Sequence, residues 1–269
     1  MIRDATRDDF PSIREILIRS NDAPYDIGKV AEEKCFGAGF EGEPRVRIFG
    51  DFEGVAVSCG KHLRILAVDR ERRGRGIGTL LVRDANAIVV AAEPGNYFTP
   101  GVPEDVARFF RKCGYVETVT TQNLICEASG EQRAASGTTR VQSAARRSPL
   151  AARRNEVLAF IEKHFGAIWR FEAAKAKTIF HVEEDGEIAG FSTHDANNRG
   201  LGWFGPTGVA KSHRGRGLGR ELLLASLADL GRLGYHRVVI PWTDAIEFYR
   251  KSCGAAIEHR FVILRRKNG

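Results

Sequence analysis

The sequence has 269 residues, of which 43% are apolar and 28% are charged, and its formal net charge is +7. This length favours one large domain or two ordinary ones with sizeable cores, and the charged fraction is ordinary for a soluble protein. No run of about 20 apolar residues is present, so we expect no membrane-spanning helix.

The first half predicts a succession of strands and helices. A strand at residues 2–6 precedes a helix that Asp8 can cap, with Ile13, Ile16 and Leu17 at the i, i+3, i+4 spacing of a helix. Strands at residues 45–50 and 54–58 are predicted to form a hairpin. A strand at residues 63–68 leads into a glycine-rich loop, and the apolar run 87–92 predicts a buried strand.

The second half predicts the same order after a linker. Small and polar residues dominate positions 128–138, which suggests domains at residues 1–127 and 139–269. A strand at 139–143 and a helix near 157–161 are followed by hairpin strands at 179–183 and 188–193. The segment 202–210 leads into a second glycine-rich loop, a long leucine-bearing helix, a strand at 238–242 and a helix at 245–251.

Two sequence motifs recur, which indicates an internal duplication. The hexapeptide RGRGIG at positions 73–78 returns as RGRGLG at positions 214–219. FFRKCG at positions 109–114 is echoed, at nearly the same interval, by FYRKSCG at positions 248–254. Two matched segments in the same order and at nearly the same interval predict a duplicated domain of about 130 residues.

Each glycine-rich loop has the chemistry of a phosphate-binding site. Glycine lets the backbone approach a ligand closely, the first N–H groups of the following helix lack internal partners, and arginine adds charge-assisted bonds. The dinucleotide fingerprint G-x-G-x-x-G fails because Thr79 stands where it requires the last glycine. The Walker A pattern fails because no Gly-Lys-Ser/Thr follows.

The pattern Arg-x-x-Gly-x-Gly at residues 73–78 and 214–219 is similar to the pyrophosphate-binding motif of the GNAT superfamily of N-acetyltransferases. AVDRERRGRGIGTLLV and GVAKSHRGRGLGRELLLASL resemble the family's strand 4, loop and helix 3, and VVIPWTDAIEFYRKSCGA resembles its strand 5 and helix 4. The resemblance implies an α/β (α+β) protein with two tandem GNAT folds. Each would be a mixed, mostly antiparallel central sheet flanked by helices, with strands 4 and 5 splayed apart.

The resemblance also implies that acetyl-CoA is the cofactor, with its pantetheine arm between the splayed strands. The implied cofactor-binding residues of the first half are Leu66, Ala67, Val68, Arg73, Gly74, Arg75, Gly76, Ile77, Gly78 and Thr79. Those of the second half are Thr207, Gly208, Val209, Arg214, Gly215, Arg216, Gly217, Leu218, Gly219 and Arg220.

The expected reaction is direct attack of a primary amine on the thioester. Tyr249 stands where the family often places the acid that protonates the coenzyme A sulfur, whereas Phe110 at the similar place in the first half cannot donate a proton. The second domain is therefore expected to be the catalytic one. Tyr97 is an alternative acid for the first domain, and Asp195 is a candidate general base.

Resemblance to tandem members of the family favours a small amine or amino sugar as the acceptor, with a protein N-terminus or lysine as the alternative. An acetyl-CoA-binding sensor with one or both domains inactive is the competing function. No nucleic-acid-binding signature, no membrane partner and no metal-ligand spacing is recognised. Five cysteines without a C-x-x-C pair suggest reduced thiols and a cytoplasmic protein, and the oligomeric state is left open.

Overall fold

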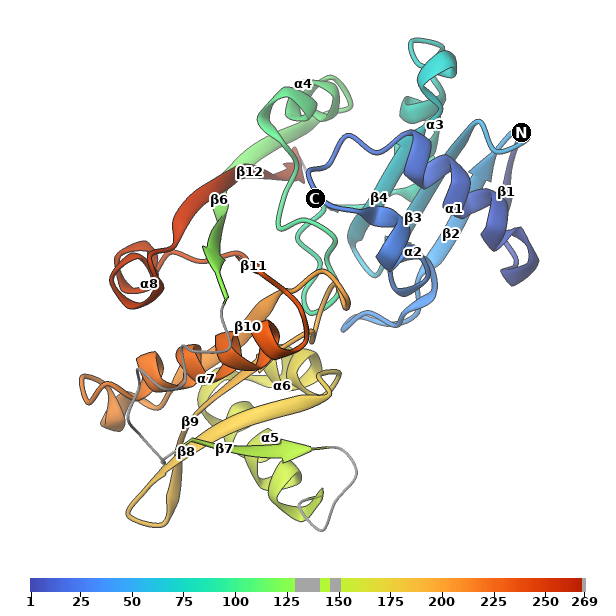
Figure 1. The fold of residues 1–269 in the computed structure, drawn as a ribbon. Helices are drawn as coiled ribbons and strands as arrows, with labels where there is room; N and C mark the ends of the chain where they lie inside the picture. Colours follow the sequence, from blue (N-terminus) through green and yellow to red (C-terminus); the bar gives the residue numbers. More distant parts are fainter. Residues whose placement is uncertain (129–140, 146–150, 268–269) are drawn as a thin grey trace. The chain divides into compact units, whose positions relative to one another are not determined.

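The computed structural model describes residues 1–128, 141–145 and 151–267, and Figure 1 shows its elements. These residues group into two compact units, Met1–Gln122 with His259–Gly269, and Asn123–Glu258. The predicted domain boundaries at 127 and 139 differ from this division, because the last strand of the chain groups with the first unit. Most of the predicted linker, residues 129–138, lies outside the described residues.

The first unit alternates short helices with the strands of one sheet. Its elements are β1 (Ile2–Asp4), α1 (Phe10–Arg19), α2 (Ile27–Phe36), β2 (Arg45–Phe49), β3 (Gly54–Cys59), β4 (His62–Val68), α3 (Ile77–Ala85), β5 (Val89–Val90), α4 (Glu104–Lys112) and β6 (Tyr115–Glu127). Short 3-10 turns lie at Arg7–Asp9 and Arg70–Arg72.

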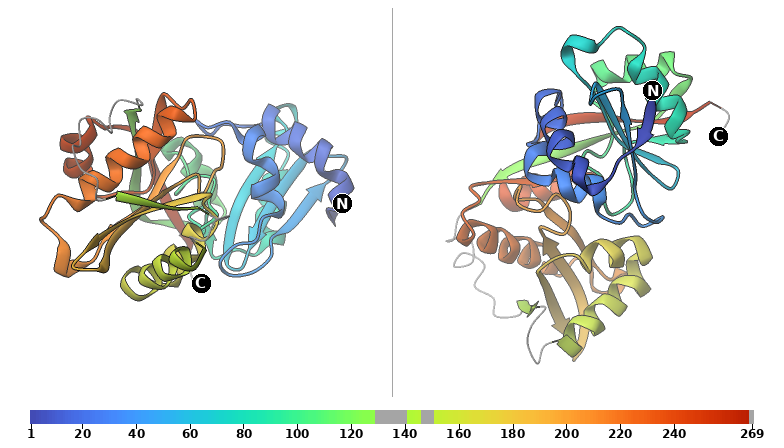
Figure 2. Two further views of the ribbon diagram at one scale, coloured as in Figure 1. Left: turned by 60° about the horizontal axis from the view of Figure 1, so that its bottom comes forward. Right: turned by 90° about the vertical axis from the view of Figure 1, so that its right-hand side faces the viewer.

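In the sheet of the first unit the strands run in the order β1-β2-β3-β4-β5, and the last strand of the chain follows next to β5. These pairs are antiparallel except for the parallel pair β4–β5. Helices α1 and α2 cover one face of this sheet and α3 covers the other (Figures 1 and 2). Ile77 and Leu81 of α3 pack on the sheet at Gly54, where an added Cβ would lie 2.8 Å from each of their side chains. The predicted hairpin and the helix with Ile13, Ile16 and Leu17 buried are confirmed.

The second unit repeats this order. Its elements are β7 (Val141–Ala145), α5 (Ala151–Phe165), α6 (Ala167–Ala173), β8 (Thr178–Glu184), β9 (Glu187–His194), β10 (Phe204–Val209), α7 (Leu218–Arg232), β11 (Arg237–Ile240), α8 (Ile246–Cys253) and β12 (Ala256–Arg266). Strands β7 to β10 form an antiparallel sheet in the order β10-β9-β8-β7.

Side-chain alternation in β8 shows how this sheet receives helices on both faces. Ile179 is buried with Val157 and Ile161 of α5, whereas its neighbour Phe180 is buried with Leu218 and Leu222 of α7. Successive residues of a strand point to opposite faces, so the two clusters lie on opposite sides of the sheet.

Two long strands carry the chain between the units. β6 begins in the first unit, and its last residues, Leu124 to Glu127, pair with β11 in the second. β12 begins in the second unit, and its residues Leu264 and Arg265 pair with β5 in the first. Each half of the sequence therefore gives its last strand in part to the unit built by the other half.

The predicted strand 87–92 is shorter than expected, because β5 spans only Val89–Val90. Ala91 and Ala92 follow with φ of 55° and 51°, outside the extended region. A long connection, 91–103, then leads to α4, whereas the much shorter segment 241–245 connects β11 to α8. No helix in the described part of the chain is long and apolar enough to cross a membrane.

Candidate functional site

The first glycine loop lies between β4 and α3, as its sequence predicts. Gly74 and Gly76 have φ of 78° and 81°, and an ideal Cβ on either would meet nothing within 4 Å. The left-handed backbone, and not crowding, therefore explains why glycine stands at both positions. Gly215 and Gly217 repeat this geometry with φ of 80° and 81°.

Both loops present the start of a helix. Gly76 is the residue before α3, and Gly217 is the residue before α7. The first N–H groups of each helix have no acceptor within that helix, and the helix dipole adds partial positive charge there. Each loop can therefore bind a phosphate oxygen through its backbone.

The third glycine of each motif serves helix packing. An ideal Cβ on Gly78 would lie 3.1 Å from the ring of Phe109 in α4, and one on Gly219 would lie 3.5 Å from the ring of Phe248 in α8. The two repeated sequence motifs of each half therefore meet in space, because the aromatic of the second motif packs on the last glycine of the first.

The parallel strands β4 and β5 separate soon after they meet. They pair only at His62–Val89 and Leu63–Val90, and the last bond runs from the Ala91 N–H to the Leu63 carbonyl at 2.8 Å. Beyond Leu63 the edge of β4 that faces β5 is no longer paired with it, and this edge borders the gap between the two strands. This is the splay that the resemblance to the GNAT superfamily implies.

Both units carry a bulge at the same repeat position. The register of β3 against β4 skips Arg64, and the register of β9 against β10 skips Gly205 and Pro206, which are joined by a cis peptide bond. The interval along the chain from Arg64 to Gly205 equals the interval between the two glycine loops. A bulge re-aims the backbone groups of its strand, so each copy redirects them where the splay begins.

A groove of about 640 Å³ runs along the opening in the first unit. Its walls are β4, the glycine loop, the start of α3, the α1–α2 connection and the segment from Phe98 to Phe110. The predicted cofactor residues that line it are Leu66, Ala67, Val68, Arg73, Gly74, Gly76, Ile77, Gly78 and Thr79. Arg75 is exposed and does not line it.

The α1–α2 connection contributes groove residues that the sequence did not reveal. Ser20, Asn21, Asp22 and Ala23 all line the groove. Ser20 is 4% exposed, and its Oγ finds no hydrogen-bond partner among the described residues. A buried hydroxyl without a partner costs free energy, so Ser20 is suited to bond a polar group of a ligand. Turn residues of this kind give no motif that a sequence search could find.

The first arginine of each motif fastens its loop. The Arg73 Nε donates to the Val68 carbonyl at 3.1 Å, and its Nη1 pairs with Asp22 at 2.8 Å. The Arg214 Nε donates to the Val209 carbonyl at 3.2 Å in the same way. These side chains hold the loop against the strand, and their contact with phosphate stays a prediction.

The remaining motif arginines lie on the surface. The Arg216 Nη1 pairs with the Glu184 carboxylate at 2.9 Å, and its Nη2 donates to the Ser212 carbonyl. Arg75, which lies two residues before α3, and Arg220, the third residue of α7, are both exposed. A bound pyrophosphate would compete with Glu184 for the Arg216 guanidinium.

An aromatic side chain of the second unit covers part of the predicted strand site. An ideal Cβ on Gly208 would lie 2.5 Å from the ring of Phe165, which stacks on Trp169 with centroids 5.3 Å apart. The neighbouring Thr207 Oγ1 donates to the Phe191 carbonyl at 3.0 Å. Glycine at position 208 is thus required by the close approach of Phe165 to the strand.

Tyr249, the predicted acid, is 6% exposed and belongs to an apolar cluster with Leu223 and Leu227. Its ring meets Phe204 edge-on, with centroids 6.2 Å apart. Burial raises the pKa of Tyr249 above its usual value, and a hydrogen bond to Thr243 partly offsets this effect. The hydroxyl therefore keeps its proton at neutral pH, and its role as an acid stays a prediction.

The other two catalytic candidates lie in connections. Asp195 follows β9 with φ of 49°, and its Oδ1 accepts a bond from the Gly200 N–H at 3.4 Å. Tyr97 is 5% exposed within the 91–103 connection. Neither residue belongs to the groove lining of the first unit, so their catalytic roles also stay predictions.

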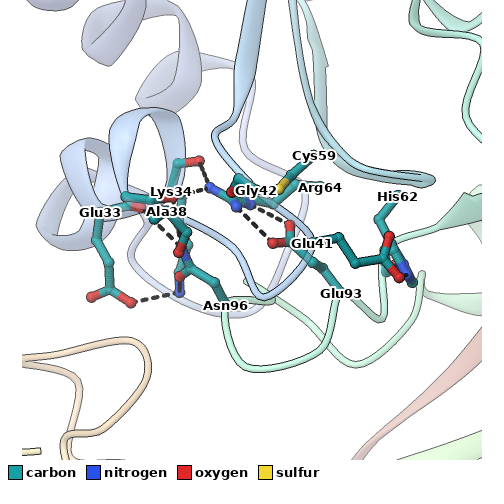
Figure 3. Close-up of polar contacts among 12 residues, drawn as sticks. Glu33, Lys34, Ala38, Glu41, Gly42, Cys59, His62, Arg64, Glu93 and Asn96 are labelled. Atoms are coloured by element: carbon teal, nitrogen blue, oxygen red, sulfur yellow. Dashed lines mark hydrogen bonds and ion pairs between the residues drawn. The ribbon is translucent and has the colours of Figure 1, made fainter. Parts of the chain in front are cut away.

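A buried polar cluster lies behind the groove and was missed by the sequence analysis (Figure 3). Arg64, the bulged residue of β4, bonds both carboxylate oxygens of Glu93 at 2.5 and 2.7 Å. Its Nη1 donates to the carbonyls of Lys34 and Gly37 at the end of α2, at 2.8 and 2.9 Å. Asn96 accepts a bond from the Lys34 Nζ at 3.0 Å, so the cluster ties α2 and the 91–103 connection to the bulge.

Comparison with known families identifies the class of protein. The family model described as "Acetyltransferase (GNAT) family" matches residues 145–255, and the model described as "Acetyltransferase (GNAT) domain" matches residues 30–117. The chain belongs to the GNAT family of acetyltransferases and carries two of its domains in tandem. A comparison with curated proteins gives no sequence match.

Solved structures share the tandem fold. The glucosamine N-acetyltransferase region of a fungal multi-domain GH3 beta-N-acetylglucosaminidase matches 98% of this chain at 17% identity with a TM-score of 0.71. The chain spans 38% of that fungal protein. A GCN5-related N-acetyltransferase from Sphaerobacter thermophilus matches at 18% identity and a TM-score of 0.63, covering 98% of this chain and 94% of that one. A tandem GNAT protein from the clavulanic acid biosynthesis pathway matches at 16% identity and a TM-score of 0.64, covering 98% and 97%.

Proposed function

We propose that the protein is an acetyl-CoA-dependent N-acetyltransferase that acetylates a primary amine. The observation that carries this proposal is the groove of the first unit, which connects a helix N-terminus at Gly76 with the splay beyond Leu63. The helix N-terminus suits the pyrophosphate, and the free edge of β4 suits the amides of the pantetheine arm. The thioester would then lie near the bulge at Arg64.

In this reaction the amine nitrogen attacks the thioester carbon, so a C–N bond forms and the C–S bond breaks. The amine gives up one proton, and the sulfur leaves as a thiolate that takes one up. Backbone N–H groups near the bulge would stabilise the oxyanion that forms between these events. The groove thus supplies binding and alignment, which are the main contributions needed for direct transfer.

The acceptor that we propose is a small amine or an amino sugar. The fungal neighbour, whose title describes a glucosamine N-acetyltransferase region, supports the amino sugar by analogy of fold only. A protein N-terminus or a lysine side chain is the alternative acceptor. A panel of amino sugars, small amines and short peptides, each assayed for release of coenzyme A, separates these classes.

A second candidate function is an acetyl-CoA sensor. It is favoured by the composition of the groove, since Asp22 is the one carboxylate among its described lining residues and is paired with Arg73. A sensor would bind acetyl-CoA without releasing coenzyme A when any amine is added. The second glycine loop, with Tyr249 as the proposed acid, is expected to bind acetyl-CoA independently of the first.

Calorimetry with acetyl-CoA tests the proposal. We expect about two sites per chain, and a loss of one site from each of the matched variants Gly76→Val and Gly217→Val. A side chain at either left-handed position strains the loop by roughly 1–3 kcal/mol without meeting a neighbour. Absence of acetyl-CoA binding by the unaltered chain would refute the proposal, and a stoichiometry near one would restrict it to the unit whose variant abolishes binding.

A further inference from the structure

Among the described residues that line the groove of the first unit, none is an unpaired base for the proton of the amine. Its described lining residues include no histidine and no tyrosine, and its one carboxylate, Asp22, is held by Arg73. Phe110 stands where the second half has Tyr249. The side chains just beyond the groove wall are therefore the next candidates for a base of the first unit.

Strand β12 runs directly behind that wall. The groove residue Val102 exchanges two backbone hydrogen bonds with Val262 of β12, at 2.9 and 2.8 Å. An ideal Cβ on the adjacent Gly101 would lie 2.7 Å from the Val262 carbonyl oxygen, so the two segments are in close contact. Just before Val262, on the part of β12 that enters the first unit, the strand carries His259.

A chain of aromatic rings connects His259 to the groove. Phe98 lines the groove, and its ring meets that of Tyr25 edge-on with centroids 6.5 Å apart. Tyr25 meets His259 edge-on at 5.8 Å, and His259 meets Phe261 at 6.3 Å. Tyr25 belongs to the α1–α2 connection, and the groove is lined on either side of it by Ala23 of the same connection and by Ile27, the first residue of α2.

These side chains have the character of an acceptor site. Tyr25 and His259 are half-buried, whereas Phe98 and Phe261 are buried, so an apolar wall ends in two polar groups that solvent can reach. A neutral imidazole has one ring nitrogen that can accept a proton. Neighbours of His259 along β12 are Glu258, which pairs with Arg237 at 2.6 Å, and the exposed Arg260.

We propose that Tyr25 and His259 form the acceptor side of the first unit, and that His259 takes the proton from the attacking amine. This inference rests on the proposed acetyltransferase function. As the C–N bond forms and the C–S bond breaks, the proton moves from the amine nitrogen to the imidazole. The thiolate then takes a proton, and coenzyme A leaves as the free thiol. The first unit therefore depends on a residue from the end of the chain.

The test compares turnover by two variants of the full chain. The parent carries Gly217→Val, which is expected to abolish acetyl-CoA binding at the second loop, and the second variant carries His259→Ala in addition. We expect turnover to fall by about 10²–10⁴-fold while the affinity for acetyl-CoA is unchanged. Added imidazole should restore part of the turnover, because it can enter the space left by the side chain. His236→Ala, at an exposed position of the second unit, is the matched control and should behave like its parent.

Three results would overturn the inference: turnover within about twofold of the parent, a loss that imidazole does not rescue, or no turnover in the parent itself. If His259→Ala does not fold, His259→Gln keeps the volume and must show the same loss of turnover. Failure of the proposed function is read separately, on the unaltered chain, as absence of acetyl-CoA binding or of transfer to any amine. In that case the inference fails with it.

Discussion

Glu93→Gln is expected to destabilise the first unit strongly, because it removes the charge that balances Arg64. Both side chains are 0% exposed, and the carboxylate receives two bonds from the guanidinium. The substitution preserves the size of the side chain but leaves a buried cation without a counter-ion. The same guanidinium donates hydrogen bonds to the carbonyls of Lys34 and Gly37 at the end of α2, so a movement of Arg64 would also displace the groove wall.

Removing one partner of a buried ion pair costs about 3–5 kcal/mol, a large part of the roughly 5–15 kcal/mol by which a native domain is stable. Since about 1.4 kcal/mol corresponds to a factor of ten, amide protection in α2 and β4 should fall by roughly 10²–10⁴-fold. The second unit should keep its protection, because its core clusters contain neither residue.

Hydrogen exchange followed by mass spectrometry measures this loss peptide by peptide. Tryptophan fluorescence during urea unfolding serves as an internal reference, since Trp169, Trp203 and Trp242 all lie in the second unit. Glu43→Gln removes an exposed glutamate of the first unit and is the matched control. A decrease in protection of less than about fivefold in α2 and β4 would refute the reasoning, because it would mean that the pair is not desolvated.

Three further predictions concern the catalytic candidates, the tight packing and the effect of pH. Tyr249→Phe is expected to lower turnover at least about tenfold at unchanged acetyl-CoA affinity, and equal turnover, or a loss only in the matched variant Tyr97→Phe, would contradict this assignment. Gly39→Ala should destabilise the first unit in urea, because an ideal Cβ would lie 2.0 Å from a Glu93 oxygen; an unchanged midpoint would show that the cluster can relax. Burial lowers the pKa of His62 below its usual 6.5, so as the pH falls the unfolded chain binds this proton before the folded chain does, and the free energy of unfolding decreases below about pH 6.5. His62→Gln should therefore reduce the pH dependence of the urea midpoint below about pH 6.5. An unchanged pH dependence would assign the titration to another group.

Local rules account for the parts that the sequence predicted correctly. The glycine loops follow from left-handed backbone positions that other residues avoid. The fold class is confirmed, including the mostly antiparallel sheets and the separation of β4 from β5. These features depend on short segments whose chemistry is visible in the chain itself.

Features that depend on distant residues were not predictable in the same way. Arg64 and Glu93 lie far apart in the sequence, and each alone looks like an ordinary surface charge. β6 and β12 were not among the predicted strands, although the apolar run from Phe261 to Leu264 was visible in the sequence. The exchange of these strands could not be predicted, because both halves have the same sequence pattern. That pattern is equally compatible with each half keeping its own last strand and with the two halves exchanging them.

The strand exchange explains how two similar sequences can build dissimilar sites. In a duplicated domain that kept its own last strand, position 259 would belong to the second unit together with the helix that precedes it. Because β12 instead pairs with β5, the first unit receives a histidine beside its groove that its own sequence does not encode. The second unit receives Cys126 of β6 in the apolar cluster that buries Tyr249. The two units therefore differ in part through the exchanged strands and in part through Phe110 and Tyr249, whereas the glycine loops have the same backbone geometry in both.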